Sequence, residues 1–101
     1  MITIDEKSKI ESPLFPLGDI EATPGAITRL QECEMTFASL LARHASGDWG
    51  DCDAEDRAAN DAAILEMSRV FSAYTLRGGR RVWVITEADR SATRFLLPDE
   101  Y

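Results

Sequence analysis

The chain has 101 residues, of which 45% are hydrophobic and 29% are charged, the balance of an ordinary globular protein with a single domain. Its formal net charge of −7 disfavours extensive contact with the phosphate backbone of a nucleic acid and favours a partner with a basic surface. No apolar run approaches the roughly 20 residues of a membrane-spanning helix, and the start lacks the pattern of a signal peptide, so we expect a cytoplasmic protein without membrane contact.

The first 13 residues are polar, show no pattern and end at Pro13. They predict a flexible N-terminal arm over residues 1–13, followed by a single α+β domain over residues 14–101. The domain is expected to begin with a short strand between Leu14 and Glu21, which Pro16 restricts to the edge of a sheet.

Two helices are predicted next, each from a threonine that can cap the first free amides. Thr23, followed by Pro24, begins a helix that runs to about Cys33. Thr36 begins a second helix, for which Gly47 is a natural end. The side chains expected to face the core are Ile27 and Leu30 in the first helix, and Phe37, Leu40, Leu41 and His44 in the second.

A third helix is predicted from Asp53, whose side chain can cap the amides near Asp56. Acidic residues in its first turn also suit the positive end of the helix dipole. The helix should run to about Ser68. Its expected core residues are Ala59, Ala63, Ile64 and Met67.

The last third of the chain predicts an antiparallel meander of three strands, residues 69–76, 80–86 and 92–97. Gly78-Gly79 is expected to form the first turn and residues 88–91 the second. Pairing about a two-residue turn places three pairs on the face toward the helices: Phe71 with Thr86, Ala73 with Val84, and Thr75 with Val82. The opposite face then carries apolar side chains, so either another part of the chain covers it or it meets a partner, with a symmetric homodimer through this face or its edge as one candidate. These side chains are Tyr74, Trp83, Ile85 and Leu96.

Several motifs, taken in order, resemble a family of small proteins encoded on bacterial plasmids and integrative elements. They are LFPLGDIEATPGAI, ARHASGDWGD, SAY, WVITEADRSAT and LLPDEY, and the resemblance covers nearly all of residues 14–101. It implies a gene that travels with mobile DNA, among conjugation, antirestriction and maintenance genes. It supplies no catalytic residue, so it implies a context and not a mechanism.

The predicted working surface lies in the acidic segment of residues 43–60. Trp49 either anchors a tight loop to the core or forms an exposed hot spot of an interface. The spacing of the acids does not match a calcium-binding loop, because Asp56 stands where the turn needs glycine and Ala62 where the last ligand belongs. No metal is therefore predicted. The residues expected to bind a partner are Asp48, Trp49, Asp51, Asp53, Glu55, Asp56 and Asp61.

Cys33 and Cys52 stand in different segments, and neither has a second cysteine or a histidine at metal-ligand spacing. We expect two reduced thiols and no zinc site. At the second turn, Asp89 is expected to accept backbone amides and Arg90 to pair with an acid.

His44 is the only histidine. It is either a favourable charge at the end of its helix or a general base tuned by a nearby carboxylate. In combination with Arg69 and Thr93 it suggests a small metal-independent nuclease, in which histidine takes the proton of a 2′-hydroxyl and arginine stabilises the phosphorane. Sheet residues that could complete such a site are Tyr74, Arg90 and Ser91. The acidic charge opposes this alternative because it repels the substrate.

The sequence favours a binding protein over an enzyme, and no cofactor is expected. The main hypothesis is an acidic accessory protein of mobile genetic elements that binds a basic, nucleic-acid-handling protein. In its sharpest form, the protein imitates the charge of DNA and antagonises a host defence system. The alternative is the nuclease or toxin-like enzyme with His44, Arg69 and Thr93. A third hypothesis is a structural dimer within a plasmid maintenance complex.

Overall fold

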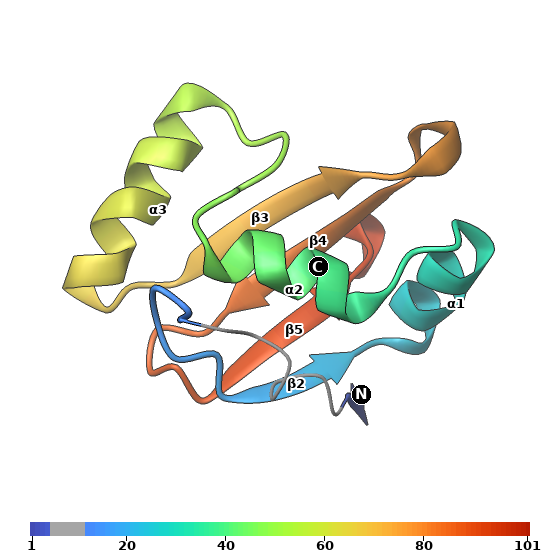
Figure 1. Ribbon diagram of the computed structural model, residues 1–101, viewed down its shortest axis with the longest axis horizontal. Helices are drawn as coiled ribbons and strands as arrows, with labels where there is room; N and C mark the ends of the chain where they lie inside the picture. The colour runs from blue at the N-terminus through green and yellow to red at the C-terminus, as the bar shows by residue number, and fades with distance from the viewer. Residues whose placement is uncertain (5–11) are drawn as a thin grey trace.

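The computed structural model describes residues 1–4 and 12–101 and shows an α+β fold of three helices and a five-stranded mixed sheet (Figure 1). The strands are β1 (Ile2–Thr3), β2 (Asp19–Ala22), β3 (Val70–Thr75), β4 (Arg81–Thr86) and β5 (Ala92–Leu96). The helices are α1 (Pro24–Glu32), α2 (Phe37–Ala45) and α3 (Ala54–Glu66), and two 3₁₀ turns are η2 (Arg77–Gly79) and η3 (Pro98–Glu100).

The strands follow the order β1-β2-β5-β4-β3 across the sheet. β5 lies in the middle, parallel to β2 and antiparallel to β4. β3 pairs antiparallel with β4, and β1 pairs antiparallel with β2. The predicted meander is therefore partly confirmed, since its three strands pair in chain order but belong to a larger mixed sheet. β2 is not an edge strand, because the first residues of the predicted arm form β1 beside it. Residues 5–11 of that arm lie outside the described residues.

The three predicted helix starts are confirmed by their caps. The Thr23 hydroxyl accepts a hydrogen bond from the Ala26 amide at 3.0 Å, and the Thr36 hydroxyl accepts one from the Ser39 amide at 3.2 Å. The Asp53 carboxylate accepts one from the Asp56 amide at 2.8 Å. Each cap satisfies an amide that has no partner within its helix, so a local sequence signal is enough to place the helix start.

The predicted register of β3 and β4 is wrong by one residue. Phe71 pairs with Ile85 and not with Thr86, because the turn is longer than Gly78-Gly79 and includes η2. A slip of one residue moves every side chain of a strand to the other face of the sheet. Tyr74, predicted on the same face as Trp83, therefore points toward the helices and is fully buried.

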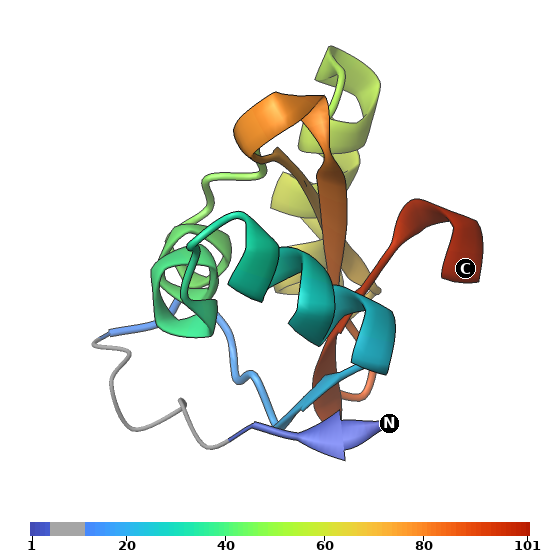
Figure 2. The same ribbon diagram turned by 90° about the vertical axis from the view of Figure 1, so that its right-hand side faces the viewer.

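The two faces of the sheet differ in their cover, and we name them by it. The inner face packs against α2 and most of α1, whereas η3 lies on the opposite, outer face (Figure 2). The side chains of the inner face are almost completely buried. They are Ile20 and Ala22 of β2, Val70, Ser72 and Tyr74 of β3, Val82, Val84 and Thr86 of β4, and Thr93 and Phe95 of β5.

α3 does not lie over a sheet face but stands beside β3, at the edge of the sheet (Figure 1). Only Asn60 and Ala63 of this helix are buried. Ala63 is placed as predicted, whereas Ala59 and Met67 are exposed and not in the core. A helix beside a strand edge has a narrower contact than a helix over a sheet, and fewer of its side chains are buried as a result.

Candidate functional site

The loop before α3 covers the open edge of β3. The Ala73 amide donates to the Trp49 carbonyl at 3.1 Å, and the Asp51 amide donates to the Ala73 carbonyl at 2.7 Å. Gly50 lies between them with φ of +72°, and a Cβ at this position would lie 2.1 Å from the Ala73 carbonyl oxygen. The glycine is therefore required by the close approach of two backbones.

Trp49 is buried and does not form an exposed hot spot. Its ring stacks on Phe15, with centroids 6.2 Å apart and planes inclined by 27°. Its indole N–H donates to the Asp61 carboxylate at 3.1 Å. Of the two interpretations from the sequence, the structure agrees with the anchor of a tight loop.

Asn60, which sequence reasoning missed, closes the next part of the β3 edge. Its side-chain amide donates to the Phe71 carbonyl at 2.6 Å and its side-chain carbonyl accepts from the Phe71 amide at 2.9 Å. A single side chain thus makes both hydrogen bonds that a neighbouring strand would make. The signal in the sequence was an asparagine among alanines in a helix, three residues before an alanine expected in the core.

The acidic residues predicted to bind a partner fall into two groups. Asp48, Asp53 and Asp61 have structural roles. Asp48 forms an ion pair with Arg43 at 2.7 Å, and this contact lowers the pKa of the Asp48 carboxyl. Asp53 caps α3, and Asp61 accepts the hydrogen bond of the Trp49 indole. The Asp51 carboxylate accepts a hydrogen bond from Thr75. Glu55 and Asp56 point into solvent in the first turn of α3. We name the exposed set Asp51, Asp53, Glu55, Asp56 and Asp61 the acidic surface.

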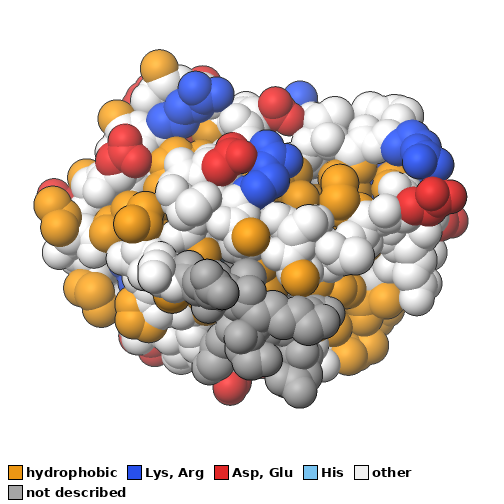
Figure 3. Space-filling model, in the orientation of Figure 1, with side chains coloured by type: hydrophobic (Ala, Val, Ile, Leu, Met, Phe, Trp, Pro, Cys, Tyr) orange, Lys and Arg blue, Asp and Glu red, His pale blue; other side chains and the backbone are white. Residues whose placement is uncertain are grey.

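The cations of the protein lie mostly away from the acidic surface. Arginines pair with acids at Glu21, Glu32, Glu34, Asp48 and Glu87, but in the part of the chain that the structure describes none pairs with the acidic surface. Arg57, on α3 itself, donates to the carbonyls of Cys52 and Gly50. On the face over α2, charged side chains are scattered, with red and blue side by side in places (Figure 3).

His44 is fully buried beneath the inner face of the sheet. Its Nδ1 lies 2.6 Å from the Ser72 hydroxyl and its Nε2 lies 2.9 Å from the Thr86 hydroxyl. The chain of bonds continues from Thr86 to Thr93 at 2.7 Å, and Thr93 donates to the Leu17 carbonyl at 2.7 Å. We name these four side chains the inner network.

The end of the inner network fixes the direction of its bonds from Thr93 back to His44. A threonine hydroxyl has one proton, and Thr93 uses its proton on a backbone carbonyl, so Thr86 must donate to Thr93. Thr86 then has only lone pairs left for His44, which must carry a proton on Nε2. The pKa of His44 is strongly lowered, so at neutral pH the imidazole carries this proton alone and its Nδ1 accepts from Ser72. Burial, with a smaller contribution from the Arg90 guanidinium, lowers the pKa of His44 from 6.5 to about 3.

The three residues of the nuclease hypothesis do not share a cleft. His44 and Thr93 are joined through Thr86 in the buried network, whereas Arg69 lies at the outer face. Tyr74 is buried on the inner face, where its hydroxyl donates to the Asp48 carbonyl at 2.7 Å. A buried neutral imidazole without access to substrate cannot serve as a general base.

Arg90 also has a structural position. It is buried and donates from two nitrogens to the carbonyls of Ala63, Ser68 and Glu87. The predicted pairing with an acid is wrong, because the guanidinium donates to backbone carbonyls in α3, just after α3 and just after β4 instead. The other half of that prediction is confirmed, since Asp89 accepts the Ser91 amide at 3.0 Å.

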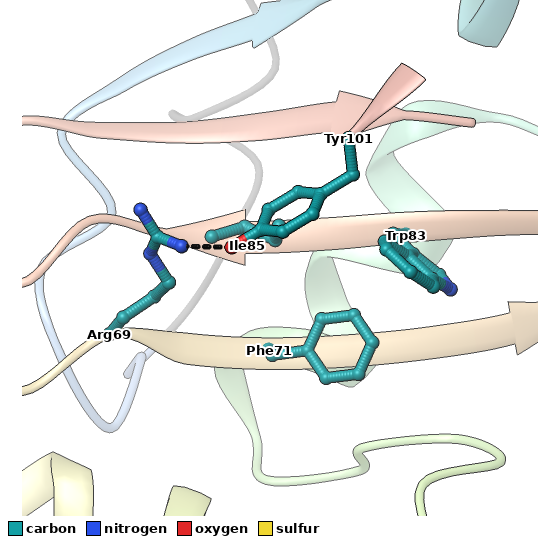
Figure 4. Close-up of a pocket in the computed structure, with 5 residues that line it drawn as sticks. All are labelled: Arg69, Phe71, Trp83, Ile85 and Tyr101. Carbon is teal, nitrogen blue, oxygen red and sulfur yellow. Dashed lines mark hydrogen bonds between the residues drawn. The ribbon is translucent and has the colours of Figure 1, made fainter. Parts of the chain in front are cut away.

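The outer face of the sheet holds a shallow hollow of about 230 Å³ (Figure 4). Ile85 forms part of its wall, and aromatic rings from β3, β4 and the segment after η3 surround it. The Trp83 ring contacts Phe71 at a centroid distance of 5.0 Å and Tyr101 at 5.6 Å, both edge to face. The Arg69 guanidinium reaches the Tyr101 hydroxyl at the rim (Figure 4). Three of the four residues predicted for a dimer face, Trp83, Ile85 and Leu96, share this face.

Within the described residues, 1–4 and 12–101, no three side chains of His, Cys, Asp or Glu come together as metal ligands. Cys33 and Cys52 are both buried thiols, and burial raises the pKa of Cys52. No helix within the same residues is both long and apolar enough to cross a membrane.

Comparisons with protein-family models, with curated proteins and with solved structures give no match. The function therefore has to be inferred from the two surfaces that this chain presents, the acidic surface and the outer face.

Proposed function

We propose that this chain is a non-catalytic binding protein whose acidic surface contacts a basic, nucleic-acid-handling protein. The observation that carries the proposal is the distribution of charge. Arginines neutralise acids over much of the molecule, while the acidic surface keeps five exposed carboxylates and, among the described residues, no salt bridge. Such a surface steers a positively charged partner toward α3 and repels nucleic acid.

The position of α3 supports this use. The helix stands beside the sheet edge and exposes most of its side chains, so a partner can reach it without unfolding any part of the protein. The best catalytic candidate from the sequence, His44, is enclosed in the inner network and has no access to a substrate. The geometry thus favours binding over the nuclease alternative.

The sharper form of the proposal is antagonism of a host defence complex on behalf of a mobile element, by imitation of DNA charge. Carboxylates along α3 and the loop before it would then stand in for backbone phosphates on a surface built to hold DNA. The resemblance to plasmid-encoded proteins supports the context of this form, and the charge supports its chemistry.

The test compares two double variants that remove the same charge from different places. Glu55→Gln with Asp56→Asn neutralises the first turn of α3 without touching the cap at Asp53. Glu32→Gln with Glu34→Gln removes two charges from the acids that pair with Arg80 and Arg77. Tagged proteins are used to capture partners from a bacterial lysate at low and raised salt, and bound proteins are identified by mass spectrometry.

We expect the wild type and the Glu32/Glu34 variant to capture the same basic protein, and the Glu55/Asp56 variant to lose it. Raised salt should release it, because the contact is electrostatic. If the two variants capture the same partners as the wild type, or if none of the three proteins captures a basic protein, the proposal is wrong.

A further inference from the structure

The outer face carries three aromatic side chains that are not fully buried, whereas Ile85 and Leu96 on the same face are buried. Tyr101 is 69% exposed, although its ring contacts Trp83 and Arg69. Phe71 and Trp83 are only partly buried, and the element that lies on this face is the short turn η3 (Figure 2). Aromatic residues and arginine are the types enriched at the centres of protein interfaces. This face therefore has the composition of an interface, separate from the acidic surface on α3.

Next to the aromatic hollow, four charged side chains form a row on the outer face, in the order Glu21, Arg94, Glu87, Arg69. Glu21 in β2 pairs with Arg94 in β5, whereas Glu87 directly follows β4 and Arg69 directly precedes β3. Adjacent members are in contact: Arg94 lies 2.8 Å from Glu21 and 3.3 Å from Glu87, and Arg69 lies 3.4 Å from Glu87. The signs alternate and the row has no net charge. We name it the charge row.

The order of signs in the charge row has a specific consequence under two-fold symmetry. Reversing the row turns minus, plus, minus, plus into plus, minus, plus, minus. Two identical rows that meet about a two-fold axis therefore place an opposite charge at all four positions. A row that began and ended with the same sign would place like charges together, so this complementarity belongs to the order seen here.

We propose that the outer face binds a second copy of this chain, about a two-fold axis that passes between β4 and β5. Arg94 of each copy then faces Glu87 of the other, and Arg69 faces Glu21. The Phe71, Trp83 and Tyr101 side chains of both copies become buried beside the row. The contact is isologous and closes after two copies.

A second copy fits this face better than the basic partner proposed for α3. The charge row is neutral, so it offers no net attraction to a strongly charged protein or to nucleic acid. The excess negative charge of the chain lies elsewhere, mainly on the acidic surface, where it does not oppose contact at the outer face.

The experiment measures the mass of the full chain in solution by sedimentation equilibrium, together with two charge reversals. Arg94→Glu places two acids opposite each other twice in a homodimer, and Glu87→Arg does the same with two cations. Each variant alone should weaken the dimer by at least about 100-fold, because like charges at an interface cost several kcal/mol. Mixed in equal amounts, the two variants should restore the dimer, since the introduced charges are then opposite in sign.

Circular dichroism of each variant checks that it is folded. Glu34→Arg, in the turn after α1 and away from the outer face, is the matched reversal and should leave the dimer unchanged. The proposal is overturned if the wild type is a monomer at the highest concentration that stays in solution. It is also overturned if either reversal alone remains a dimer, or if two folded variants fail to associate when mixed.

Discussion

The inner and outer faces of the same sheet both carry polar groups among apolar ones, but the two sets of polar groups differ in their access to solvent. On the inner face, the hydroxyls of Ser72, Thr86 and Thr93 form one network with His44 and a backbone carbonyl, and all three residues are fully buried. On the outer face, the charge row keeps its side chains partly exposed beside open aromatic rings. The polar groups of the inner face are therefore enclosed, whereas those of the outer face can be reached from solvent.

The largest loss of stability is expected from Thr86→Val on the inner face. The substitution keeps the shape of the side chain but leaves the His44 Nε2–H and the Thr93 oxygen without their partner. We expect a loss of about 2–4 kcal/mol in the free energy of unfolding, measured by urea denaturation. Thr75→Val, at the exposed end of β3, is the matched control and should cost less than about 1 kcal/mol. Equal losses in both variants would contradict the special role of the inner network.

A change in pH should also act on the inner face. The folded-state pKa of His44 lies near 3, below the ordinary 6.5 of the unfolded chain. The unfolded state therefore takes up the proton first, and stability is highest above pH 6.5 and falls as the pH drops between about 6.5 and 3. The loss should approach roughly 1.4 kcal/mol for each pH unit.

Urea denaturation at a series of pH values measures this slope, and His44→Gln isolates it from the titration of the carboxylates. Since the chain has one histidine, its imidazole signal in NMR is unambiguous. A chemical shift that titrates near pH 6.5 in the folded protein would contradict a buried neutral imidazole.

Between the two faces lies the β3 edge, which Asn60 closes with its side chain. Asn60→Ala should leave the Phe71 amide and carbonyl unpaired and cost about 2 kcal/mol. Hydrogen exchange of the Phe71 amide should rise relative to the Ala73 amide, which the Asp48–Asp53 loop still covers. If both amides exchange at their original rates, the two hydrogen bonds from the Asn60 side chain do not protect this strand.

The smallest effect is expected on the outer face. Arg69→Gln removes a cation from the charge row, and because this ion pair is largely exposed the loss in stability should stay below about 1 kcal/mol. The measurement is urea denaturation at a protein concentration low enough to avoid self-association. A loss as large as that of Thr86→Val would show that the charge row supports the fold and not an interface.

Features that depend on neighbouring residues in the sequence were predicted correctly, whereas features that depend on distant segments were not. Thr23, Thr36 and Asp53 each cap a helix within three residues of themselves, so their roles follow from sequence alone. The register of β3 depends on η2, a turn whose shape is not determined by Gly78-Gly79. One wrong register moved Tyr74 from the buried face to the open one.

The pairing of β2 with β5 could not be predicted, because it joins segments some 70 residues apart and leaves no periodic trace in either. The role of Asn60 depends on a backbone that only the fold brings near it. The charge row likewise draws its members from four separate segments. The sequence therefore predicted apolar residues of the outer face, Trp83, Ile85 and Leu96, but not the charge row beside them.

The central place of β5 has a consequence for the order in which the protein can be made. β2 leaves the ribosome early, but its parallel neighbour, residues 92–95, is synthesised only after all three helices and two further strands. Until then β2 lacks that neighbour, and β4 presents an unpaired edge at what will become the middle of the sheet. Assembly of the sheet during translation must therefore wait for β5. A nascent chain stalled before β5 would expose the unpaired edges of β2 and β4, which can form hydrogen bonds with other chains.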